Sequence, residues 1–164
     1  MGGGDPFSVA RAAGLELIGK PEGLTLTDGT MELRADFGRM LPRLKQGRLQ
    51  QELLVKAARA KGIGRPWAID ATAGIGEDSL LLAAAGCEVT LFEQDQVIAA
   101  LLQDTMRRAL EEVALHEIVM RMQLVEGDSI DHLRMLGETG ERPDVIYLDP
   151  MFPERQKSGL VKKK

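Results

Sequence analysis

Short apolar segments alternate with amphipathic segments over the second half of the chain. Four apolar runs have the length of strands, at residues 67–71, 88–93, 122–126 and 144–149. Helical spacing of apolar residues lies between them, at about 77–85, 96–114 and 130–136. Strands that alternate with helices predict an α/β fold with a parallel sheet, whose loops after the strands meet along one carboxyl edge, where ligands of such folds bind.

The first part of the chain has a different pattern. Residues 24–33 alternate apolar and polar positions around Asp28-Gly29, which predicts a small hairpin with a two-residue turn. Residues 46–61 mix apolar and basic positions at helical spacing, which predicts a basic amphipathic helix that stops before Gly64. We therefore divide the chain into an N-terminal hairpin and basic helix at 1–64 and a core at 65–164.

Composition is that of an ordinary soluble protein. The 164 residues are 44% hydrophobic and 28% charged, and no apolar run approaches the roughly 20 residues that span a bilayer. The single cysteine, Cys87, favours a buried core residue, and the N-terminus shows no targeting pattern. We predict a cytoplasmic protein without a membrane segment or a metal site.

Charge is segregated along the sequence. The net charge is −4, yet residues 36–65 hold eight basic residues against two acidic ones, and residues 154–164 hold five against one. Basic patches on an acidic body suit local binding of a polyanion, which should weaken as salt rises. A solvated helix face and a frayed tail would give the same pattern, so charge alone leaves both interpretations open.

A glycine-rich loop follows the first strand of the core. Asp70-Ala-Thr-Ala-Gly-Ile-Gly76 joins that strand to a helix, so Gly74 and Gly76 can bring the backbone close to a ligand while Asp70 adds negative charge. Glu93 ends the next strand, where a carboxylate can accept hydrogen bonds from ribose hydroxyls. The two features together indicate a nucleoside-containing ligand, although a glycine turn can also serve only to pack a helix on a sheet.

The residues after the loop favour one ligand over another. A nicotinamide site calls for a third glycine, but position 79 is Ser. Glu77 and Asp78 would lie poorly beside a pyrophosphate, whereas they suit the cationic amino-acid end and sulfonium of S-adenosylmethionine. After the third strand, Asp128 and Ser129 could bind an adenine amino group, or could simply cap the next helix.

The turn Asp149-Pro-Met-Phe-Pro153 is the most specific motif. Asp149 and the carbonyl of Pro150 could accept hydrogen bonds from an exocyclic amine and orient it for attack, while Phe152 stacks on the base. A proline-rich strand exit with a core phenylalanine is the alternative. Tyr147, inside the same strand, is predicted to pack in the core.

At these residues the sequence resembles the RsmJ (YhiQ) type of small-subunit ribosomal RNA guanine-N2 methyltransferases, over about residues 36–164. The resemblance rests on Asp36-Phe37, the Arg-rich segment, Asp70-Ala-Thr-Ala-Gly-Ile-Gly76, Gly86-Cys87, Val97-Ile-Ala-Ala-Leu-Leu102, Val145-Ile-Tyr-Leu-Asp-Pro-Met-Phe-Pro153 and Gln156-Lys-Ser-Gly-Leu-Val-Lys-Lys163. It implies a class I, Rossmann-like methyltransferase fold with S-adenosyl-L-methionine as donor. Since that fold continues through strands five to seven, we also predict that this chain lacks the last strands.

The resemblance also implies roles for single residues. It implies donor contacts at Glu77, Asp78, Glu93, Gln94, Asp128, Ser129 and Asp149. The glycine loop itself adds expected contacts at Asp70, Gly74 and Gly76. Family members usually have Arg, Arg and Ser where Glu77, Gln94 and Asp128 stand. The expected partner is small-subunit ribosomal RNA or the assembled small subunit, with phosphates held by Arg39, Arg43, Lys45, Arg48, Arg155, Lys157, Lys162 and Lys163. Methylation of another amine, such as adenine N6 or a glutamine amide, and a non-catalytic RNA-binding module are the alternatives; a dehydrogenase is a distant third.

Overall fold

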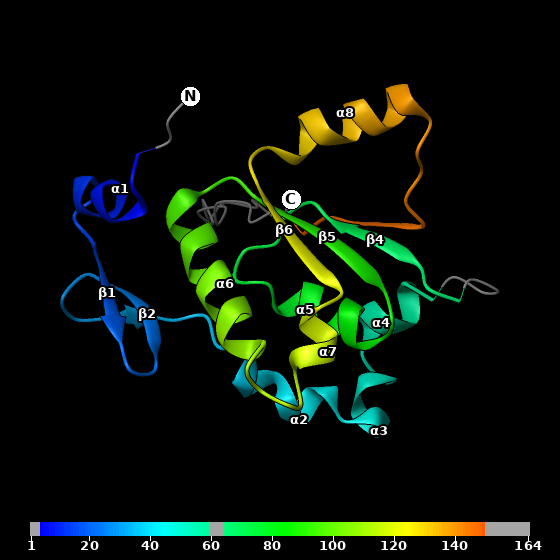
Figure 1. Cartoon of the computed structure of the whole chain (residues 1–164), viewed down its shortest axis with the longest axis horizontal. Helices are drawn as coiled ribbons and strands as arrows, with labels where there is room; N and C mark the ends of the chain where they lie inside the picture. The colour runs from blue at the N-terminus through cyan, green and yellow to red at the C-terminus, as the bar shows by residue number, and fades with distance from the viewer. Residues whose placement is uncertain (1–3, 60–63, 150–164) are drawn as a thin grey trace, which may run out of the picture.

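A four-stranded parallel sheet lies at the centre of the computed structural model, which describes residues 4–59 and 64–149 (Figure 1). Its strands are β4 (Trp67–Asp70), β5 (Glu88–Glu93), β6 (Met122–Glu126) and β7 (Val145–Tyr147). They lie in the order β6-β5-β4-β7, so the order along the chain reverses between β4 and β7. Open sheets bind ligands at such a switch point, outside the carboxyl ends of the strands.

The predicted strands and helices of the core are confirmed to within a few residues, except in one region. The helices are α5 (Glu77–Ala84), α6 (Gln96–Ala109), α7 (His116–Val119) and α8 (Ser129–Thr139). The predicted helix over 96–114 was too long, because α6 ends at Ala109 and α7 is a separate short helix. The chain turns between them, and this turn places Leu115 fully inside the core.

The two faces of the sheet are covered differently. Alternate strand residues point to opposite faces. Ala68, Val89 and Leu91 join the main hydrophobic core with α5, whereas Ile69 and Phe92 face the other way and pack against Leu136 of α8. Among the helices of the described residues, α8 alone lies on its side of the sheet (Figure 1). Cys87 is buried in the main core, as predicted.

The N-terminal residues form a small helix and a separate sheet, which lie beside α6 (Figure 1). The helix is α1 (Pro6–Ala12), and the antiparallel sheet contains β1 (Glu16–Lys20), β2 (Gly23–Thr27) and β3 (Glu32–Leu33). The predicted hairpin is confirmed, but its turn has four residues, because Thr27 pairs with Glu32 and the Asp28 carboxylate accepts the amides of Thr30 and Met31. Strand β1 and helix α1 were not predicted.

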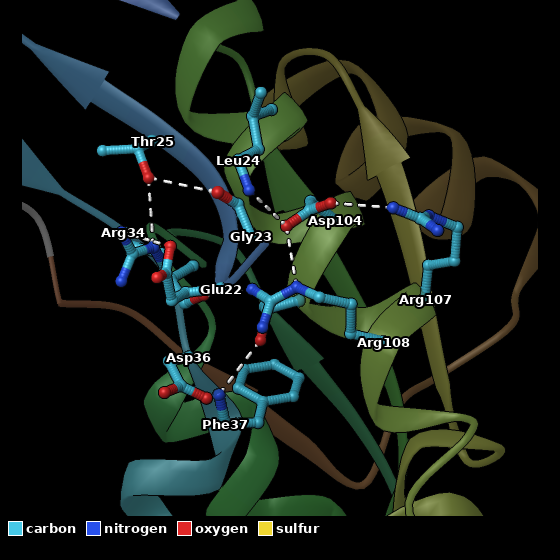
Figure 2. Close-up of polar contacts among 12 residues, drawn as sticks. Glu22, Gly23, Leu24, Thr25, Arg34, Asp36, Phe37, Asp104, Arg107 and Arg108 are labelled. Carbon is cyan, nitrogen blue, oxygen red and sulfur yellow. Dashed lines mark hydrogen bonds and ion pairs between the residues drawn. The ribbon is translucent and has the colours of Figure 1, made fainter. Parts of the chain in front are cut away.

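Asp104 of α6 holds this N-terminal sheet against the core (Figure 2). Its carboxylate accepts the amide of Leu24 in β2 at 2.9 Å and the guanidinium of Arg108 at 2.9 Å. Arg108 donates in turn to the carbonyl of Ala35 at 2.7 Å. Nearby, the hydroxyl of Thr105 accepts the amide of Phe37 at 3.0 Å. These bonds, of which those of Asp104 and Arg108 are charge-assisted, fix the chain that leads from the small sheet into the core.

The prediction of one continuous basic helix over 46–61 was wrong. The described part of that range has two short helices instead, α3 (Gln46–Leu49) and α4 (Leu53–Ala57). Two more short segments precede them, η1 (Phe37–Met40) and α2 (Leu41–Leu44). Lys45 and Glu52 are extended, at ψ 136° and 129°. These breaks let Leu49 and Val55 both reach the main core while Leu53 stays 81% exposed, which a straight helix could not do. Residues 60–63 lie outside the described part.

No helix within residues 4–59 and 64–149 has the length and apolar character needed to cross a membrane.

Candidate functional site

The predicted site residues gather where the parallel strands end. The amide of Ala71, just after β4, donates to the carbonyl of Tyr147 in β7 at 3.0 Å. On the other side of β4, the amide of Ala73 donates to the carbonyl of Phe92 in β5 at 2.9 Å. The loop that follows β4 is therefore held between the ends of its two neighbouring strands, at the switch point of the sheet.

The two loop glycines have different physical roles. Both have positive φ, 57° at Gly74 and 83° at Gly76, which favours glycine at each position. A Cβ on Gly74 would meet no atom within 4 Å, so its surroundings are open. A Cβ on Gly76 would lie 2.4 Å from Leu102 of α6 and 3.2 Å from Phe37. Gly76 therefore permits Leu102 and Phe37 to pack closely against the loop. Of the two glycines, only Gly74 leaves the loop backbone accessible to a ligand.

Glu93 closes the loop from the neighbouring strand. Its two carboxylate oxygens accept the amides of Gly74 at 2.9 Å and Asp95 at 3.0 Å. A carboxylate has room for about four hydrogen bonds, so this half-buried group keeps capacity for ligand hydroxyls. Gln94 follows it and is exposed. The arrangement is compatible with the predicted ribose contact, which stays a prediction.

Asp70 lies behind the loop, completely buried. One carboxylate oxygen accepts the amide of Thr72 at 3.0 Å, and the other accepts the hydroxyl of Ser79 at 2.6 Å. Burial raises the pKa of the Asp70 carboxyl above its usual value, although both hydrogen bonds act in the opposite direction. The predicted contribution of its charge to a ligand stays untested, while its contacts show that it orders the loop on α5.

Replacing Asp70 with asparagine should change how stability depends on pH. Because its folded-state pKa is raised, Asp70 favours folding most below its usual pKa, and this contribution is lost as pH rises through the folded-state value. Asparagine can accept from Thr72 and donate to Ser79 without carrying charge. We expect Asp70→Asn to gain free energy of unfolding relative to wild type between about pH 4 and about pH 7 in urea titrations. A constant difference across that range would contradict this role of burial.

The first turn of α5 carries the half-buried acidic side chains of Glu77 and Asp78. Tyr147 was predicted only to pack, but its hydroxyl donates to the Asp78 carboxylate at 2.8 Å. Burial, and then this bond, raise the pKa of Tyr147 well above its usual value, so the hydroxyl remains a donor at neutral pH. No local sequence pattern signals this bond, since it joins elements that only the sheet brings together.

Asp128 caps α8. Its carboxylate accepts the amide of Ile130 at 2.9 Å, and Ser129 is the first residue of the helix. The capping interpretation left open by the sequence is therefore realised. A second role in binding adenine, through the exposed Asp128 or through Ser129, remains a prediction.

Asp149 lies just beyond the end of β7, next to the glycine loop. Its amide donates to the hydroxyl of Thr72 at 2.8 Å, and its side chain is exposed. Pro150 and Phe152, the other members of the predicted acceptor turn, lie outside the described residues. The structure thus brings the start of that turn against the predicted donor loop.

The basic residues predicted to hold phosphates are in different environments. Arg43 makes two hydrogen bonds to Glu52, at 2.9 and 3.1 Å, which raise the Arg43 pKa together with the negative charges of Glu52, Glu77 and Asp78. Arg39 lies 3.8 Å from Asp36. Lys45 and Arg48 are exposed. The remaining four, Arg155, Lys157, Lys162 and Lys163, lie outside the described residues.

The acidic groups at this edge suit a cationic ligand. Within residues 4–59 and 64–149, none of Glu77, Asp78 and Glu93 forms a salt bridge. The nearby cation Arg43, whose pKa the charges of Glu77 and Asp78 help to raise, is bound to Glu52. Three carboxylates that form no salt bridge, next to an accessible glycine loop, favour a positively charged nucleoside. No group of three or more His, Cys, Asp or Glu residues in the described part is arranged to hold a metal ion.

Known proteins that are similar to this chain indicate which ligand this site binds. Residues 7–164 match the family model described as "Putative SAM-dependent methyltransferase". Ribosomal RNA small subunit methyltransferase J of Thioalkalivibrio sulfidiphilus is 48% identical over 142 residues, which are 85% of this chain and 55% of the relative. The protein of that name from Aeromonas salmonicida is 47% identical, over 77% of this chain and 50% of its own length. These relatives confirm the resemblance seen in the sequence.

A solved structure is also similar. The crystal structure of a SAM-dependent methyltransferase from Neisseria gonorrhoeae matches with a TM-score of 0.67 and 29% identity, over 83% of this chain and 56% of that one. The match confirms the predicted Rossmann-like methyltransferase fold. The chain spans about half the length of the curated relatives it matches.

Proposed function

We propose a specific reaction for this chain, which belongs to the family of S-adenosylmethionine-dependent methyltransferases: methylation of the exocyclic N2 amine of a guanosine in small-subunit ribosomal RNA. The observation that carries the proposal is the hydrogen bond between Thr72 of the donor loop and Asp149 of the acceptor turn. The names of the curated relatives support small-subunit RNA as the acceptor.

The donor side is formed by the loop after β4 and the end of β5. Bound S-adenosylmethionine supplies a methyl group activated by a positively charged sulfur. Glu93 would bind the ribose hydroxyls, and the carboxylates of Glu77 and Asp78 would favour the cationic end of the donor. Asp78 is oriented for this by the hydroxyl of Tyr147. The chain's own contribution is to orient and electrostatically stabilise the ligand.

The acceptor side is formed by Asp149 and the residues after it. A guanine N2 amine is a weak nucleophile, because its lone pair is delocalised into the ring. Asp149 would accept a hydrogen bond from this amine and aim its lone pair at the methyl carbon. Transfer would form a carbon–nitrogen bond in place of the carbon–sulfur bond, whose electron pair would stay on sulfur, and the amine would lose one proton to solvent. Phe152 would stack on the exposed base.

The basic residues within 36–65 would bind the RNA backbone. Lys45 lies between α2 and α3, and Arg48 lies on α3; both are exposed, so their charges are available to phosphates. Arg43 is committed to Glu52 and contributes less free charge than the sequence implied. Together with Arg39 and the basic residues after 154, these side chains would hold RNA mainly through electrostatic contacts.

Transfer of a labelled methyl group tests the reaction. The chain is incubated with labelled S-adenosylmethionine and either unmodified small-subunit RNA or assembled subunits, and the RNA is digested to nucleosides. We expect label in N2-methylguanosine. Label in N6-methyladenosine, or in protein glutamine, would show that the acceptor is another amine, while the chain would still be a methyltransferase. Donor and RNA binding without transfer to either substrate would favour a non-catalytic RNA-binding module.

A further inference from the structure

A chain of hydrogen bonds joins helix α5 to the acceptor turn through the donor loop. The hydroxyl of Ser79 in α5 donates to Asp70 at 2.6 Å, and Asp70 accepts the amide of Thr72 at 3.0 Å. The hydroxyl of Thr72 then accepts the amide of Asp149 at 2.8 Å. Ser79 and Asp70 are completely buried, so the inner end of this chain is fixed by the core.

Strand β7 is tied to the same segment at two further points. The carbonyl of Tyr147 accepts the amide of Ala71 at 3.0 Å, and its hydroxyl donates to Asp78 at 2.8 Å. Both bonds lie before the acceptor turn. The Thr72 bond is different, since it reaches Asp149 itself, after β7 ends at Tyr147. Thr72 therefore sets where the acceptor turn leaves the sheet.

We propose that Thr72 is a positioning residue for methyl transfer, whose hydroxyl fixes Asp149 relative to the donor loop. This role rests on the proposed function. In-line transfer requires close alignment of the amine with the methyl carbon, and an error of about 1 Å can cost roughly 100-fold in rate. Thr72 acts through the Asp149 backbone, whose amide its hydroxyl accepts.

Substitution of Thr72 tests this role. Thr72→Val keeps the shape of the side chain but cannot accept the Asp149 amide. We expect kcat to fall by roughly 10–100-fold with unchanged donor affinity in calorimetry. The Asp149 amide should exchange its hydrogen faster by roughly 5–10-fold, because one hydrogen bond is lost. Thr72→Ser retains the hydroxyl and should restore both quantities; Thr72→Ala is the alternative if the valine variant does not fold.

Thr90 offers a matched control. Its hydroxyl accepts the indole N–H of Trp67 at 3.1 Å, in the same sheet but away from the acceptor turn. Thr90→Val should leave kcat and Asp149 exchange unchanged. Wild-type kcat in Thr72→Val, or an equal loss in Thr90→Val, would overturn the positioning role alone. A wild-type chain that binds the donor but methylates no acceptor would overturn the proposed function and this role with it.

Discussion

Replacing Asp149 with alanine should lower kcat for methyl transfer by about 100–1,000-fold, the usual cost of removing one preorganised hydrogen-bonding group from a transition state. Its exposed carboxylate emerges at the switch point of the sheet, and its amide is already fixed by Thr72. The side chain is thus free to bind an acceptor while the backbone stays in place. Donor affinity should fall much less than kcat, because Asp149 is one of several expected donor contacts and those proposed for the loop and Glu93 remain.

Rate measurements at saturating donor and RNA would show this effect, with donor affinity taken from calorimetry. Glu141→Ala is a matched control, since Glu141 is an exposed carboxylate before the start of β7. We expect wild-type kcat in that variant. Turnover by Asp149→Ala within a few-fold of wild type would move the catalytic role to another group and contradict the proposed orientation of the amine.

Replacing Gly76 with alanine should lower the free energy of unfolding by about 2–4 kcal/mol, which combines left-handed strain with overpacking. At φ 83° an added Cβ is strained, and it would lie 2.4 Å from the tip of Leu102. Leu102 is completely buried, and Phe37 lies 3.2 Å from the same Cβ, so neither side chain can move aside cheaply.

Gly74→Ala separates the two components of this loss. Gly74 has φ 57°, but an added Cβ would meet nothing within 4 Å, so we expect a loss of about 1–2 kcal/mol from backbone strain alone. Urea unfolding measures both variants. Equal losses in the two would show that the close approach of Leu102 to Gly76 costs nothing.

The strands of the core were predictable because local pattern decides them. Residues 67–71, 88–93, 122–126 and 144–149 are apolar runs bounded by turn residues, and each became a strand of the parallel sheet. Burial of most residues in the central strands β4 and β5 favours apolar side chains there, which is a local signal. The right-handed connection of parallel strands then placed Asp70, Glu93 and Asp149 at one edge, as the sequence predicted.

The predicted basic helix shows the limit of that reasoning. Residues 46–61 have a helical pattern, but Leu49 and Val55 both reach the main core only if the helix breaks at Glu52. Helical spacing shows only which residues would share one face of a helix. It does not show the shape of the core surface on which that helix must pack. The N-terminal β1 and α1 were missed for a related reason, since α1 is stabilised by packing on α6 and β1 by pairing with β2.

The sequence by itself determined the fold class, the family and the positions of the candidate donor and acceptor motifs, because strand pattern and motif spacing are properties of neighbouring residues. Only the tertiary structure decided what these residues contact. The close approach of Leu102 requires glycine at position 76, 26 positions earlier. Tyr147 orients Asp78 across 69 positions, and Thr72 holds Asp149 across 77. Such pairs are created when the sheet assembles, so no local pattern encodes them.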